Sequence, residues 1–141
     1  MNIRKIIIFM LSFAMIVLIS ACNNKEYIDV NDINIEFMLP SDDNADGVKI
    51  AITNHCKFSI ALLPNNYIDE VFQLTLPDGA LVIPSEQQVI LDDEINVKSD
   101  VTLEEFIENI KNSDLSFSFL PDTADNSSEQ VVIIKLNSCF N

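Results

Sequence analysis

A short acidic loop holds the side chains with the clearest potential for chemistry. Asp42, Asn44 and Asp46 stand at alternate positions, and Gly47 follows them. Side-chain oxygens in this order suit a hard cation such as calcium, and a glycine permits the sharp turn of a calcium loop. The pattern then departs from that loop, because Thr53 occupies the twelfth position, where a bidentate glutamate is needed. Turns between strands are also rich in Asp, Asn and Gly, so the sequence favours a polar turn over a weak calcium site.

The only histidine and two of the three cysteines are the next candidates. His55 directly precedes Cys56, and Cys139 lies near the end of the chain. Adjacent strand residues point to opposite faces, which disfavours Cys–His catalysis. The chain also has no C-x-x-C motif of the kind that binds zinc. Two cysteines are the right number for one disulfide in an oxidising compartment, which predicts a bond between Cys56 and Cys139. The alternative is two free thiols.

Acidic residues gather in two further sets: Asp92, Asp93 and Glu94, and then Glu104, Glu105 and Glu108. A glycosidase needs two carboxylates at a defined separation, which a sequence does not set. The chain has no tryptophan and only two tyrosines to stack on a sugar, and its two glycines exclude a glycine-rich phosphate loop. We therefore interpret these sets as a loop and a solvated helix face, with a hydrolase as the enzymatic alternative.

The first 21 residues have the features of a secretory signal peptide. Arg4 and Lys5 form a short cationic segment, and an apolar run over residues 6–19 follows them. A cationic start, an apolar middle and an exit of small residues are typical of export signals. The apolar run is also shorter than the roughly 20 residues that a membrane span needs.

The exit of this segment, Ile19-Ser20-Ala21-Cys22, resembles the lipobox of bacterial lipoproteins. In that motif the cysteine after two small residues becomes the lipidated first residue of the mature chain. Ile19 departs mildly from the pattern, since leucine is commonest there. The resemblance implies cleavage after residue 21, and diacylglycerol and N-acyl (palmitate-type) lipid on Cys22. Asn23 is not the aspartate associated with inner-membrane retention, so the resemblance implies the outer membrane, facing the periplasm or the outside.

Charge limits the partners of the mature chain. The 141 residues include 8 basic and 22 acidic ones, with a net charge of −14. Loss of Arg4 and Lys5 with the leader leaves 120 residues with 6 basic and 22 acidic ones, a net charge of −16. Such a chain has no Lys/Arg patch for nucleic acid, and its charge favours a basic protein partner or cations.

Residues 22–32 are polar and predict a lipidated N-terminus and tether, and residues 33–141 are long enough for a single domain with one core. Apolar and polar residues alternate there with the period of a half-buried strand. The predicted strands cover residues 33–39, 48–53, 57–62, 72–76, 80–83, 88–91, 115–119 and 132–136. Between two of them, residues 102–112 place Leu103, Phe106, Ile107 and Ile110 on one helix face.

Thr102 and Glu105 form a capping box for this helix. Strands at short, regular spacing predict a mainly β fold, an antiparallel β-sandwich with one α-helix that crosses between edge strands. Pairing of residues 48–53 with 58–63 around Asn54 and His55 resembles the early strands of immunoglobulin-like domains of bacterial lipoproteins. The tryptophan of true immunoglobulins is missing.

These features together predict a non-enzymatic, membrane-anchored lipoprotein that binds a protein or serves envelope assembly. One alternative is an inhibitor or immunity lipoprotein that neutralises a basic cell-wall-degrading enzyme, because charge complementarity speeds association. Another is a calcium-binding module of the adhesion type, which would use the loop of Asp42, Asn44 and Asp46.

Overall fold

The structure is a computed structural model that describes residues 26–122 and 130–140. The predicted signal peptide, the lipobox and Cys22 lie outside the described residues. Within the described part the strands are β1 (Ile33–Met38), β2 (Lys49–Asn54), β3 (Ile60–Leu62), β4 (Asn66–Ile68), β5 (Phe72–Thr75), β6 (Leu81–Ile83), β7 (Gln88–Leu91), β8 (Ile95–Val97), β9 (Ser116–Pro121) and β10 (Val132–Lys135). The helical elements are η1 (Val30–Asp32), α2 (Leu103–Asn112) and η2 (Leu136–Phe140).

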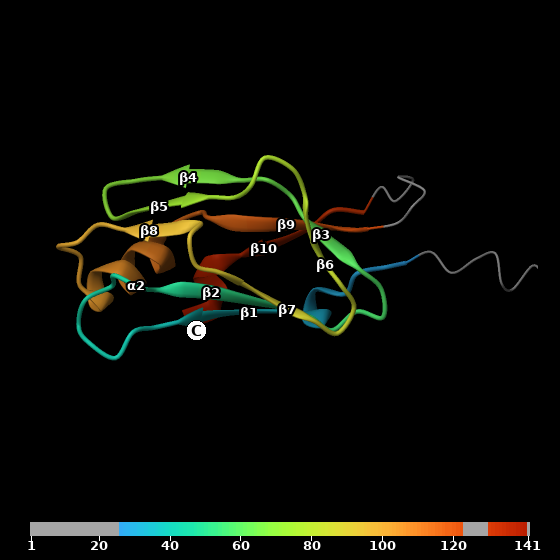
Figure 1. The fold of residues 1–141 in the computed structure, drawn as a ribbon, viewed down its shortest axis with the longest axis horizontal. Helices are drawn as coiled ribbons and strands as arrows, with labels where there is room; N and C mark the ends of the chain where they lie inside the picture. Colours follow the sequence, from blue (N-terminus) through green and yellow to red (C-terminus); the bar gives the residue numbers. More distant parts are fainter. Residues whose placement is uncertain (1–25, 123–129, 141) are drawn as a thin grey trace, which may run out of the picture.

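Two antiparallel sheets form the body of the domain, with strand orders β1-β2-β7 and β10-β9-β3-β6 (Figure 1). This is the layout of strands A-B-E and G-F-C-C′ in an immunoglobulin-type sandwich. The predicted β-sandwich is therefore confirmed. The predicted pairing of β2 with β3 is wrong, because β2 pairs with β1 and β7 while β3 pairs with β6 and β9. The chain crosses from one sheet to the other between them.

A third, smaller sheet has the order β4-β5-β8. Its β4–β5 hairpin is inserted between β3 and β6, and β8 follows β7. The sequence does not predict the strands at residues 66–68 and 95–97, because each is only three residues long. At the first of them, Asn65 and Asn66 also suggest a turn. Asn65 links the hairpin to the body of the domain. Its Nδ2 donates to the carbonyl oxygen of Ser116 in β9 at a distance of 2.9 Å.

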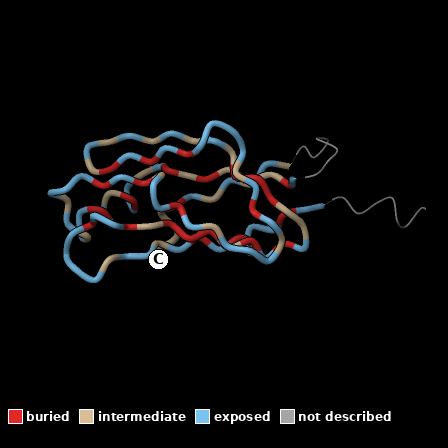
Figure 2. Tube along the Cα trace, viewed as in Figure 1, coloured by how far each residue is buried: buried red, intermediate tan, exposed pale blue. Residues whose placement is uncertain are grey.

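The core lies between the layers, as the buried segments in Figure 2 show. β9 has the burial pattern of a half-buried strand: Phe117 and Phe119 are fully buried, and the residues on either side of them are less so. Burial of one such side chain stabilises the fold by about 2 kcal/mol. Phe106 of α2 meets Phe72 of the third sheet edge-on at 5.4 Å and Phe37 of β1 at 5.9 Å between ring centroids. The helix therefore joins the third sheet to the body.

The helix begins where the sequence predicts. Thr102 is its N-cap, with its hydroxyl accepting from the backbone N–H of Glu105, and Glu105 accepts in return from the N–H of Thr102. Phe106 and Ile110 are its buried residues. The expected link between two edge strands is only half right, because α2 leads from β8, an edge strand, to β9, which lies inside its sheet.

Across the described residues, no helix has the length and apolar character that crossing a bilayer requires.

Candidate functional site

An open groove of about 390 Å³ lies between the β4–β5 hairpin and α2. Its lining residues are Tyr67, Val71, Glu105, Glu108, Asn109, Asn112 and Ser113. The helix residues among them recur at spacings of three and four, so they share one side of α2. Asn112 and Ser113 belong to the C-terminal end of the helix, where the helix dipole favours a positive charge.

Asp69 holds the hairpin side of the groove in place. Its Oδ1 accepts from the backbone N–H groups of Val71 at 2.7 Å and Phe72 at 2.9 Å, and its Oδ2 accepts from the hydroxyl of Tyr67 at 2.7 Å. Burial by itself raises the pKa of Asp69, but the hydrogen bonds from Phe72 and Tyr67 outweigh it and leave this pKa below its usual range. The carboxyl group is therefore ionised at neutral pH.

Tyr67 stays protonated beside that carboxylate. Burial, followed by the hydrogen bond to Asp69, raises the pKa of Tyr67 to about 12. Its ring packs on Phe72 with 5.1 Å between centroids. The hydroxyl donates to Asp69, so the ring has a set position and lines the groove.

Asn109 supplies a polar atom without a partner. Its side chain makes a hydrogen bond that helps to lower the pKa of Asp69, but its Oδ1 is buried and accepts no hydrogen bond in the described structure. A buried acceptor without a donor costs about 1–3 kcal/mol. This buried oxygen is therefore a local cost in the fold beneath the wall of the groove.

The charges around the groove are negative. The hydrogen bonds from the backbone and hydroxyl of Thr102 lower the pKa of Glu105, so this carboxylate is ionised at neutral pH. Within residues 26–122 and 130–140, the ion pairs are Lys49–Asp92, His55–Glu86 and Lys135–Asp114, and none includes Glu105 or Glu108. The groove thus combines an aromatic wall with carboxylates, which together suit a cationic group.

The loop that contains Asp42, Asn44 and Asp46 forms a compact turn. Asn44 Oδ1 accepts from the backbone N–H of Asp46 at 3.0 Å, and Gly47 has a φ of 89°, which favours glycine. Ala45 is fully buried, and its N–H donates to the carbonyl of Val101 at 3.1 Å. No three His, Cys, Asp or Glu side chains of the described residues gather as metal ligands. Calcium binding by Asp42, Asn44 and Asp46 stays a hypothesis without a preformed ligand set.

The structure contradicts the predicted disulfide, because Cys56 and Cys139 are both free thiols. Cys139 belongs to η2, whose Phe140 packs on Phe37 at 4.8 Å between ring centroids. Cys56 follows the end of β2 that pairs with Ile33. Four strand residues, roughly 13 Å, separate Ile33 from Phe37, whereas a disulfide needs Cα atoms within about 7 Å.

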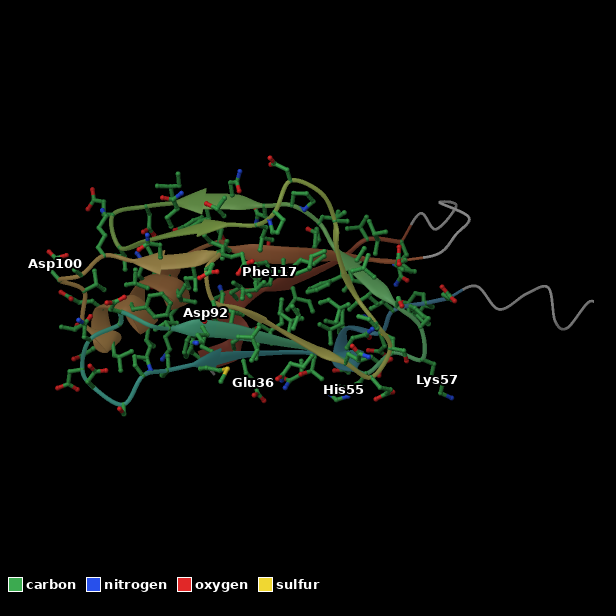
Figure 3. All side chains as sticks on the ribbon, in the orientation of Figure 1. Glu36, His55, Lys57, Asp92, Asp100 and Phe117 are labelled. Carbon is green, nitrogen blue, oxygen red and sulfur yellow. The ribbon has the colours of Figure 1, made fainter. Side chains whose placement is uncertain are left out.

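Cys56 and His55 do not form a catalytic pair in this structure. Figure 3 shows His55 at the end of the domain where the described chain begins, with Lys57 beyond it. Nδ1 of His55 lies 3.9 Å from a carboxylate oxygen of Glu86. Cys56 is buried, and burial, with a contribution from Asp32, raises the pKa of its thiol. The protonated thiol is the unreactive form.

The fold places the two acidic sets in different surroundings. Asp92 accepts from Lys49 Nζ at 2.6 Å, and Glu94 accepts from the backbone N–H of Asp92, so this loop is a turn between β7 and β8. Glu105 and Glu108 instead reach the groove. The sequence pattern missed Tyr67, Asp69 and Asn109, because only the β4–β5 hairpin brings the first two beside the helix.

Comparison of this chain with protein families, with curated proteins and with solved structures finds no match.

Proposed function

We propose that this protein is a lipid-anchored domain of the bacterial envelope that binds a basic protein partner and performs no catalysis. The groove between the β4–β5 hairpin and α2 carries the proposal, since its aromatic wall and its carboxylates suit a cationic side chain. The net charge of −16 on the mature chain supports the same choice, because it attracts a basic partner over long distances. The lipobox resemblance at Cys22 supports the anchor and an outer-membrane location.

An arginine side chain from the partner fits the chemistry of the groove best. A guanidinium group can lie against the ring of Tyr67, where a cation–π contact is worth about 0.5–2 kcal/mol. Its planar fork can donate to both carboxylate oxygens of Glu108, which is exposed and lines the groove. A lysine has a single ammonium group and would satisfy fewer of these acceptors.

A basic cell-wall-degrading enzyme is a partner of the required charge. If the domain neutralises such an enzyme, the arginine in the groove would belong to that enzyme, and the strong negative charge would speed its capture. The measurement is inhibition of added lysozyme by the mature domain, and the inhibition should fall as the salt concentration rises.

The groove is tested with a short blocked peptide that contains one arginine and with the same peptide carrying citrulline, which keeps the shape and removes the charge. We expect the arginine peptide to shift NMR signals of Tyr67 and α2 and the citrulline peptide to have little effect. Glu108→Gln should weaken binding roughly two- to five-fold, as expected for an exposed ion pair.

Glu104→Gln is the matched control for Glu108→Gln, because it removes the same charge from the same helix outside the groove. Equal loss in the two variants would show general charge attraction and would end the proposal for the groove. The anchor is tested separately by mass spectrometry of the protein extracted from membranes. A mass that begins at Cys22 and includes acyl chains is expected, whereas a mass that retains Met1 would contradict the anchor.

A further inference from the structure

Three exposed apolar side chains lie on two segments that meet where the described chain begins. Tyr27 is 71% exposed, Val30 is 49% exposed and Val131 is 52% exposed. We call these three residues the anchor-end patch. Single exposed apolar side chains are normal on a protein surface, whereas a group of them indicates a contact site. These three come from two segments that are about a hundred residues apart in the sequence.

Hydrogen bonds hold the two segments together. The side-chain amide of Gln130 donates to the carbonyl of Ile28 and accepts from its backbone N–H, with both distances 2.9 Å. Ile28 itself is 1% exposed and belongs to the core. Asp29 then caps η1 by accepting from the N–H of Asn31. These hydrogen bonds hold the backbone that carries the patch. Its side chains stay outside the core, because Ile28 already occupies the core position.

The patch lies close to the proposed lipid. Tyr27 is five positions after Cys22 in the sequence, and five fully extended steps along the chain span at most about 18 Å. A headgroup layer is about 5–8 Å thick on each side of the hydrocarbon core. A chain of this length therefore keeps the patch at, or within a short distance of, the lipid surface.

We propose that the anchor-end patch rests on the phospholipid interface and sets the orientation of the domain; this rests on the lipid anchor of the proposed function. Tyr27 suits that position because tyrosine is amphipathic and is enriched at headgroup level. Glu26 and Asp29 are exposed beside it, so the fitting surface is zwitterionic rather than anionic.

This orientation directs the groove away from the lipid. Figure 1 shows α2 and the third sheet at the end of the domain opposite to the start of the described chain. Asp100, which precedes the helix, marks that far end in Figure 3. A partner that approaches from the aqueous side then meets the groove first, while the patch stays on the lipid.

The chain has no tryptophan, so single-tryptophan variants report one position each. Tyr27→Trp reports the patch, and Ile68→Trp in β4, where Ile68 is 70% exposed, is the matched control near the groove. Both lipidated full-length variants are reconstituted in phosphatidylcholine vesicles with or without brominated acyl chains. We expect blue-shifted emission from Tyr27→Trp that loses most of its intensity with brominated lipid, and unshifted, unquenched emission from Ile68→Trp.

Flotation of the vesicles separates the two ways of failing. A protein that does not float with the vesicles contradicts the lipid anchor, and with it this inference. A protein that floats while Tyr27→Trp stays unquenched leaves the anchor in place and overturns the orientation. Equal quenching at both positions would overturn it too, because the domain would then lie without a preferred face on the lipid.

Discussion

At the scale of single residues, Asn54 does more for the sandwich than any other polar side chain that the structure describes. It is the only buried polar residue in that part of the chain, with no exposed surface. Its Nδ2 donates to the carbonyls of Phe58, Ile83 and Pro84 at 3.0, 3.0 and 3.1 Å, and its Oδ1 accepts from the N–H of Cys56 at 2.9 Å. These contacts tie β2 to the sheet that contains β3 and β6, at the point where the chain crosses between sheets.

Replacement of Asn54 by alanine should therefore lower the free energy of unfolding by about 3 kcal/mol, because several buried backbone groups lose their partner at once. Asn54→Asp should cost at least as much, since a carboxylate would face three carbonyl oxygens. Urea denaturation measures both. Asn34→Ala is the control: its side chain is exposed and bonds only to Glu36, so a change within about 0.5 kcal/mol is expected. A similar small change for Asn54→Ala would refute this account.

The raised pKa of Tyr67 predicts a loss of folding stability at high pH. Folding raises its pKa from the ordinary value of 10.0 to about 12, so the folded state holds the proton more tightly than the unfolded state does. The resulting stability is complete below about pH 10 and is lost as the pH rises to about 12. In Tyr27→Phe, Tyr67 is the only tyrosine left, and its ultraviolet titration should have a midpoint near pH 12. A midpoint near 10 would show that the contact with Asp69 does not form.

At the scale of elements, the capping box fixes the start of α2 with groups of the helix itself. Thr102→Ala removes the hydroxyl that accepts from the N–H of Glu105, and the expected loss in the free energy of unfolding is about 1 kcal/mol. Thr102→Ser keeps an oxygen in the same place and should restore most of that loss. Thermal unfolding, monitored by circular dichroism, measures the loss in each variant. Equal losses in both variants would show that the cap does not stabilise the helix.

The elements that the sequence predicted are those whose signals are local. The helix has its cap and its apolar face within residues 102–112, and β9 alternates along its own length. The pairing of β2 with β1 and β7, in place of β3, depends on contacts between distant segments, which periodicity does not contain. The same limit applies to the groove: Glu105 and Glu108 were visible as the polar face of a helix, but nothing local indicates that the turn at Asp69 packs beside it.

At the scale of the whole molecule, the two proposed contact sites lie at opposite ends of the sandwich. The proposed lipid contact through Tyr27 is at one end, and the groove with Asn109 is at the other. The two sheets between them form a continuous core, so the distance between lipid and partner is set by the fold. The β4–β5 hairpin and α2 line the groove, at the end of the sandwich away from the proposed lipid contact.

The net charge, −14 for the whole chain and −16 after the predicted cleavage, gives a prediction that also tests the acidic loop. Self-repulsion of 22 acidic residues destabilises the folded state, so added salt should raise the melting temperature by screening. Magnesium and calcium chloride at equal ionic strength should then raise it equally, because the loop at Asp46 lacks a preformed ligand set. An extra rise with calcium alone that Asp46→Ala abolishes would contradict this and would establish a calcium site. An extra rise that survives Asp46→Ala would locate the cation elsewhere on the acidic surface.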